Sequence, residues 1–271
     1  MLLAMCLAVC LAAVLPVAFG GFCDDPAWDQ VWGDEFSGDT LNISSWSVMN
    51  NTSPNDSSCR DAMCLTSNVR VEGGALILTA REEAAGWARF TTGAIDSRDK
   101  RFFQATRDKP FRLCVSGMLP GGKGTGSGLW PAFWMMPNDD SCWPDHGEQD
   151  IFEMINGDGV AHATYHVSNA TASGPWCKYH DTSEGGSRFI PGWDTAYHEY
   201  AIERRVDSLA FVYDSVTVYN STGGPRRVLD VPWYLILNFA VGGPWPHPVN
   251  ASTVFPCETK VNYVRVSVPK M

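Results

Sequence analysis

Residues 147–154 read Gly-Glu-Gln-Asp-Ile-Phe-Glu-Met and place three carboxylates, Glu148, Asp150 and Glu153, among apolar side chains. The isoleucine, phenylalanine and methionine are typical of a protein core, so the pattern predicts a buried or half-buried strand rather than a solvated run of charges. Burying carboxylates without cationic partners is costly, and few Lys or Arg residues lie nearby in the sequence. Such like-charge clusters raise the pKa of one acid while another stays ionised.

The spacing of the acids decides between helix and strand. On a helix, Glu148 and Glu153 would point about 140° apart and could not converge. On a regular strand, Glu148 and Asp150 share one face while Glu153 falls on the other. A β-bulge after Asp150 adds one residue and brings all three carboxylates to one side. Turn residues before and after the run bound a strand of ordinary length.

Clustered acids of this kind serve two sorts of chemistry. Two carboxylates flanking a bond, one ionised as nucleophile and one protonated as acid, are what retaining glycoside hydrolysis requires, at a separation of roughly 5 to 5.5 Å. Clustered carboxylate oxygens also suit a structural Ca²⁺ ion. The acidic run alone does not distinguish a catalytic site from a calcium site, so the surrounding sequence has to decide between them.

Short runs of alternating apolar and polar residues recur along the chain, and glycine pairs separate them. Helical periodicity of useful length is missing, so we predict an all-β fold, a jelly-roll sandwich of two antiparallel sheets with a concave face that holds the acids. No linker or repeat divides residues 21–271, which predicts a single domain. The predicted strands are residues 68–71, 76–80, 90–97, 129–135, 161–167, 199–205, 210–213, 234–239 and 263–268.

The chain contains 11 tryptophans, more than packing alone explains. Trp130 and Trp134 are four apart and fall on one side of a strand, while Trp143 and Trp245 lie in segments near the acids or rich in Gly and Pro. Aromatic faces stack on the apolar faces of sugar rings, so these four residues are predicted to bind substrate. Core filling is the alternative for each single tryptophan. It is our assignment, as core or rim, for Trp46, Trp87 and Trp233.

His166 lies 13 residues after Glu153 on a predicted neighbouring strand. His162 is four residues before it and shares its face. A structural histidine is the usual explanation of such a residue. One hairpin away from a carboxylate cluster, a hydrogen bond from His166 to the substrate or the nucleophile becomes an equal alternative.

The net charge of −10 and the pI near 5.0 disfavour nucleic acid or an anionic membrane as partner, because either would need a basic patch. A neutral polysaccharide fits better. We expect a monomer that requires no cofactor, with structural calcium as an open alternative.

Residues 1–20 are almost entirely apolar and end in Ala-Phe-Gly, which predicts a cleaved secretory signal and an extracellular protein. A membrane anchor is the competing interpretation, because the first residues carry no Lys or Arg. Seven N-glycosylation sequons agree with export, at Asn42, Asn50, Asn51, Asn55, Asn169, Asn220 and Asn250.

Seven cysteines remain after the predicted signal, so disulfides are expected in an oxidising compartment. The number is odd, which leaves at least one thiol unpaired within the chain. Cys59 and Cys64 could close a small loop, and no C-x-x-C pair indicates a zinc or redox site.

Five stretches in one order along the chain resemble motifs of a single family. Residues 32–38 resemble a W-x-D-E-F-x-G opening, 128–136 a G-L-W-P-A-F-W-M-L-P strand, 148–153 an E-x-D-x-x-E signature, 234–246 a Y-L-I-L-N-x-A-V-G-G-x-W-P segment, and 261–266 a last strand. The family is glycoside hydrolase family 16, in its laminarinase-like branch.

The resemblance implies a retaining, endo-acting hydrolase of β-1,3-glucan or mixed β-1,3/1,4-glucan. It implies that Glu148 is the nucleophile, Glu153 the general acid/base, and Asp150 a support for the nucleophile. The positions that it implies to line sugar subsites, or the loops beside them, are Trp130, Trp143, His166, Asn238 and Trp245.

The chain departs from the family pattern near the expected subsites. Ala94 stands where the family usually has the arginine of S-G-R-I, and Cys114 where it has a glutamate. Linkage specificity therefore stays open. The alternatives are a transglycosylase, a galactan- or agar-type hydrolase, and a non-catalytic β-glucan recognition protein. The last would be expected to lack the acids, and all three are present.

Overall fold

The computed structural model describes residues 21–50, 53–54, 56–122, 124–139, 141–168, 181–221 and 231–271. The predicted signal, residues 1–20, lies outside these ranges, as do the sequons at Asn51, Asn55 and Asn169 and the cysteine Cys177. The described part is almost entirely β, with two short 3-10 helices, η1 (Phe22–Asp24) and η2 (Thr66–Asn68). Within it, no helix is long and apolar enough to cross a membrane.

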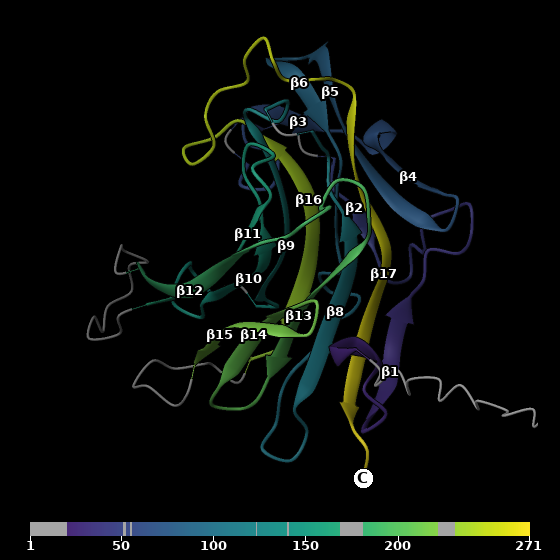
Figure 1. Ribbon diagram of the computed structural model, residues 1–271, viewed down its shortest axis with the longest axis vertical. Coiled ribbons are helices and arrows are strands. Elements are labelled where there is room, and N and C mark those ends of the chain that lie inside the picture. Colours follow the sequence, from purple (N-terminus) through teal and green to yellow (C-terminus); the bar gives the residue numbers. More distant parts are fainter. Residues whose placement is uncertain are drawn as a thin grey trace, which may run out of the picture.

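The described strands form two sheets that stack as layers (Figure 1). The sheet that carries the acids has seven strands in the order β12-β11-β10-β9-β16-β7-β2. All its neighbours pair antiparallel. Its strands are β2 (Ser47–Val48), β7 (Ala94–Asp96), β9 (Leu129–Pro137), β10 (Glu148–Glu153), β11 (Val160–Ser168), β12 (Asp181–Phe189) and β16 (Trp233–Val241).

The second sheet has ten strands and covers the other side of the core. Its main path is β15-β14-β13-β8-β17-β5-β6-β3, with β1 on β17 and β4 on β5. Its strands are β1 (Trp28–Asp34), β3 (Ala62–Cys64), β4 (Val69–Glu72), β5 (Ala75–Ala85), β6 (Ala88–Thr92), β8 (Phe111–Met118), β13 (His198–Arg204), β14 (Leu209–Tyr213), β15 (Val216–Ser221) and β17 (Cys257–Pro269).

Strand β9 shows how the sequence sorts residues between core and cleft. Leu129, Phe133 and Met135 belong to the main core between the sheets, while Trp130 and Trp134 alternate with them and face the other way. Side chains on both faces of β9 are buried, apart from the half-buried Met136. The two-residue period therefore directs one set of side chains to the core and the other to the site.

Each of the nine predicted runs falls on or overlaps described strands, so the all-β prediction is confirmed. The single strand predicted over residues 90–97 is wrong. The chain leaves one sheet after β6 and enters the other at β7, with Gly93 between them. A Cβ at Gly93 would lie 2.4 Å from the Asn68 carbonyl oxygen, so the crossing requires glycine.

Two disulfides are present in the described residues. Cys59 is bonded to Cys64, which confirms the small loop, and Cys23 is bonded to Cys114. Cys114, which stands where the resembled family has a glutamate, thus links the segment before β1 to strand β8 through a disulfide. Cys142 is also disulfide-bonded, and Cys257 is a free thiol.

Candidate active site

The bulge predicted in the acidic run is present. Asp150 pairs with Trp134 on β9, and Phe152 pairs with Phe133. An advance of two residues along β10 therefore corresponds to one residue along β9. The pairing with β11 shifts at the same place, between Asp150 and Glu153. Ile151 and Phe152 both join the core as a result, and Glu153 returns to the face that carries Glu148 and Asp150.

This face forms the floor of a cleft of about 670 Å³. All three acids line it, together with the predicted substrate-binding residues Trp130, Trp134, Trp143, His166, Asn238 and Trp245. Every predicted site residue therefore meets in one place. Ser57 and Arg60, which the sequence did not indicate, also line the cleft.

Burial and mutual repulsion keep protons on the carboxyls. Burial, together with the charge of Glu148, raises the pKa of Glu153 to about 7. The pKa of Glu148 is raised well above its ordinary value, first by burial and then by the charge of Asp150. Burial and the charge of Glu153 likewise raise the pKa of Asp150. Since Glu148 and Asp150 are adjacent, they titrate as a pair.

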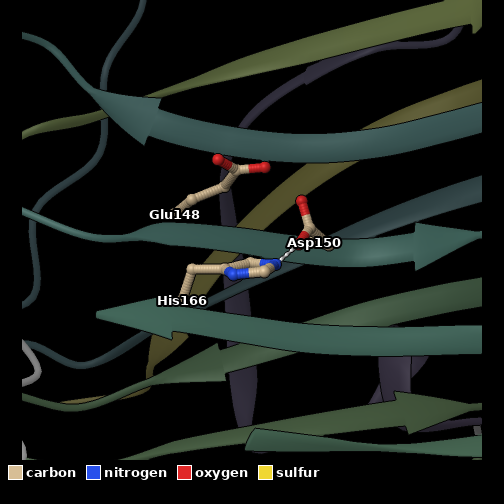
Figure 2. A group of neighbouring side chains, drawn as sticks. All are labelled: Glu148, Asp150 and His166. Carbon is tan, nitrogen blue, oxygen red and sulfur yellow. Dashed lines mark ion pairs between the residues drawn. The ribbon is translucent and has the colours of Figure 1, made fainter. Parts of the chain in front are cut away.

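His166 supplies the positive charge that this cluster needs (Figure 2). Its imidazole is directed from β11 at Asp150 on β10, with Nε2 at 3.3 Å from Asp150 Oδ2. This contact is an ion pair rather than an aligned hydrogen bond, because Oδ2 has no hydrogen-bond partner among the described residues. Burial opposes the charged imidazole, but its carboxylate neighbours prevail and raise the pKa of His166 to about 10.

Asp181 holds the other side of the imidazole. Its Oδ2 lies 2.9 Å from His166 Nδ1, and it comes from the first residue of β12. This contact fixes the ring orientation and the position of Nε2 toward Asp150. Asp181 could not be predicted from the sequence pattern, because only the pairing of β11 with β12 brings it beside His166.

Trp130 and Trp134 lie on the cleft floor with their indole N–H groups donated to protein atoms. Trp130 Nε1 donates to Glu153 Oε1 at 3.0 Å, and Trp134 Nε1 donates to Asn238 Oδ1 at 2.8 Å. Asn238 in turn donates to the Ser58 carbonyl oxygen at 2.7 Å. These three residues orient the acid and the cleft wall, and little of their surface remains free.

The accessible aromatic surfaces belong to the two loop tryptophans. Trp143 is 44% exposed and Trp245 40% exposed, against 9% for Trp130. The Trp143 ring centroid lies 5.8 Å from that of His166. Trp245 packs edge-on against Trp130 and His162, at 5.5 and 5.1 Å. Among the core or rim assignments, Trp46 and Trp233 are buried, while Trp87 is 44% exposed.

Glu148, Asp150 and His166 each offer an atom within 4.8 Å of the others, which is the spacing of a cation site. A metal ion would have to displace the proton that the raised pKa keeps on His166, because a metal ligand must be the neutral imidazole. The arrangement fits proton transfer between carboxyls better than coordination of an ion.

Comparison with known proteins identifies the family to which the chain belongs. A model described as the XgeA-like, catalytic GH16 domain, where GH16 is glycoside hydrolase family 16, matches residues 117–188. The chain is also 30% identical over 259 residues to a beta-glucanase from Rhodothermus marinus, covering 89% of this chain and 85% of the relative. The chain belongs to glycoside hydrolase family 16.

Two further similar proteins show how far the likeness extends. The X-ray structure of an endo-beta-1,3-glucanase from Pyrococcus furiosus superposes with a TM-score of 0.76 at 27% identity, covering 90% of this chain and 95% of that one. A glucan endo-1,3-beta-glucosidase A1 from Niallia circulans is 30% identical, and the match covers 89% of this chain but 38% of that protein. The predicted jelly roll and the enzyme class, a glycoside hydrolase, are thereby confirmed.

One departure from the family pattern now has a structural setting. Ala94, which stands in place of an arginine, is completely buried. It packs with Cys59 and Cys64. The disulfide-closed loop therefore covers the position from which a longer side chain would reach into the cleft.

Proposed function

We propose that this family 16 glycoside hydrolase cleaves internal β-1,3-linked glucosyl bonds of a neutral glucan with retention of configuration. The observation that carries the proposal is the β10 bulge, which gathers Glu148, Asp150 and Glu153 on the floor of one cleft. The relatives named as beta-glucanase and endo-beta-1,3-glucanase support the choice of substrate.

In the first step, a carboxylate oxygen of Glu148 attacks the anomeric carbon while Glu153 gives its proton to the departing glycosidic oxygen. The bond from carbon to that oxygen breaks as the bond to Glu148 forms. Glu153 is suited to the acid role because burial raises its pKa to about 7. In the second step, Glu153 takes a proton from water, and the water oxygen displaces Glu148.

Asp150 and His166 stabilise the negative charge of the proposed nucleophile, Glu148. Glu148 and Asp150 resist joint ionisation and share one proton, which in the resting site favours Glu148, because Asp150 is paired with His166. Glu148 becomes the nucleophile when that proton moves to Asp150. The imidazolium of His166 faces the same pair and offsets the remaining negative charge. We assign Asp150 to support of the nucleophile on this basis.

Export is part of the proposal. Its support is the apolar segment 1–20 and the Cys23–Cys114 and Cys59–Cys64 disulfides, which are typical of an oxidising compartment. Expression in a eukaryotic secretory host tests this point. The N-terminal sequence of the protein in the medium should begin at or close to Gly21.

The activity is tested by incubating the protein with β-1,3-glucan, mixed β-1,3/1,4-glucan and agarose in parallel and analysing products by mass spectrometry. We expect a series of short oligosaccharides from β-1,3-glucan, and NMR of the first products should show the β anomer. Transfer products, products from agarose alone, or binding without cleavage would each contradict the proposal.

A further inference from the structure

A cation that the mechanism above does not use lies beside the catalytic acid. The guanidinium carbon of Arg60 lies 4.7 Å from the ring centroid of Trp130, the residue that donates its indole N–H to Glu153. Arg60 lines the cleft, and its charge acts to lower the pKa of Glu153. Arg60 therefore lies on the side of the cleft where Glu153 would protonate the departing glycosidic oxygen.

The fold holds Arg60 in a specific backbone conformation. The Cys59–Cys64 disulfide closes the loop, and Asp61 N donates to the Val241 carbonyl oxygen at 2.9 Å. Arg60 itself has φ 59°, a left-handed conformation that an arginine adopts only where its surroundings impose it.

Gly242 and Gly243 make room for the loop. A Cβ at Gly242 would lie 2.0 Å from Asp61 Oδ2. One at Gly243 would lie 3.2 Å from the Arg60 side-chain carbons. The stem of Arg60 is thus packed between Gly243 and Trp130, which places its charged end at the cleft.

The guanidinium has hydrogen-bonding capacity left over. Its Nε is buried and has no hydrogen-bond partner within the described ranges. A buried donor without an acceptor is destabilising, and arginine presents its donors in a rigid fork that matches paired oxygen acceptors. A ligand oxygen that reaches this wall would satisfy the Nε donor that the protein leaves open.

We propose that Arg60 is a substrate-binding residue that donates hydrogen bonds to hydroxyl oxygens of the glycosyl unit lying against Trp245, beside Glu153. The inference rests on the proposed function and adds to it the residue that fixes one sugar in the cleft. Neutral hydroxyls are favoured over a sulfate or carboxylate substituent, because the same cleft holds three carboxyls.

The test compares Arg60→Met with the wild type on laminarin-type oligosaccharides, with kcat and KM measured separately. Methionine keeps an apolar stem over Trp130 and removes the donors. Losing charge-assisted hydrogen bonds should raise KM about 10- to 100-fold while kcat changes less than about 3-fold. Arg89→Met is the matched control. Arg89 also lies over an aromatic ring, Phe90 at 5.4 Å, but is on β6 and ion-paired to Glu82.

Two results would overturn the inference. One is an unchanged KM in Arg60→Met with normal cleavage by the wild type, and this result would leave the proposed function intact. The other is a fall in kcat alone with a displaced pH profile, which would make Arg60 a group that acts only through Glu153. If the methionine variant does not fold, Arg60→Lys replaces it, and KM should again rise because the fork is lost.

A sulfated galactan, tested beside β-1,3-glucan, mixed β-1,3/1,4-glucan and agarose, separates this inference from the proposed function. Wild-type cleavage of a sulfated galactan instead of neutral glucan, lost in Arg60→Met, would refute the proposed glucan specificity and the preference for hydroxyls together. This result would still leave Arg60 as a residue that contacts the substrate. Absence of cleavage and binding on all arms would refute both proposals.

Discussion

Replacing Trp130 by phenylalanine tests whether the proton on Glu153 is controlled as the structure indicates. The Trp130 indole N–H donates to Glu153 Oε1 at 3.0 Å and so favours the ionised carboxylate. Phenylalanine keeps most of the ring in the cleft floor and removes the donor. The pKa of Glu153, about 7 in the wild type, should therefore rise.

The size of the rise follows from the kind of bond that is lost. A hydrogen bond to a charged group contributes roughly 1.5–3 kcal/mol, and one pKa unit corresponds to about 1.4 kcal/mol. The pKa should thus rise by about 1 to 2 units. Because Glu153 must be protonated to act as the proposed acid, we expect activity to disappear as pH rises through this pKa. The variant should keep its activity to higher pH.

The assay is the pH dependence of kcat/KM, whose basic limb reports the acid in the free enzyme. Trp134→Phe is the matched control, since its indole N–H is donated to Asn238 and not to an acid. Its basic limb should stay where it is in the wild type, whatever its rate. A Trp130→Phe protein that folds normally but shows an unmoved or lowered basic limb would refute the reasoning.

Three further substitutions have expected outcomes. Glu148→Gln should reduce kcat by at least about 10³-fold without lowering the melting temperature at pH 7, because it removes a buried acid that Asp150 repels; glucan cleavage at the normal rate would exclude Glu148 as nucleophile. Asp181→Asn should destabilise the protein by about 1 kcal/mol. The pKa of His166 is raised to about 10, so its imidazolium stabilises the fold fully below pH 6.5, and this stabilisation is lost as the pH rises to about 10. The free energy of unfolding of Asp181→Asn, measured with urea, should therefore be lower than that of the wild type at pH 6 and equal to it at the alkaline end. A difference that does not change with pH would contradict the role of Asp181 as a partner of the imidazolium. Gly242→Ala should destabilise by about 1–3 kcal/mol, since its φ is 73° and a Cβ would meet Asp61; an unchanged denaturant midpoint would mean that the loop adapts.

The sequence was informative wherever the deciding property is local. A two-residue period distinguishes strand from helix within a few residues, and the positions of Glu148 and Glu153 required a bulge that β10 indeed contains. The same period placed Trp130 and Trp134 on one face. The prediction that His166 lies near the acids was also correct, because consecutive antiparallel strands are neighbours.

Non-local relations were decided only by the tertiary structure. Residues 90–97 look like one strand because alternation does not reveal that the chain changes sheets at Gly93. Trp130 and Trp134 look like Trp143 and Trp245 in the sequence, yet the first pair is buried and hydrogen-bonded while the second is accessible. Exposure depends on what other segments cover, and the residue itself does not encode that.

The three acids, the strand that bears them and its bulge were therefore determined by the sequence, because the spacing of charged and apolar side chains fixes which face each one occupies. Their partners were decided by the fold. Asp181 reaches His166 through the β11–β12 pairing, and Arg60 reaches Trp130 through a disulfide-closed loop docked on β16. Electrostatic effects depend on distance in space, so the charges that tune this site could come from any part of the chain that folding brings within a few ångströms.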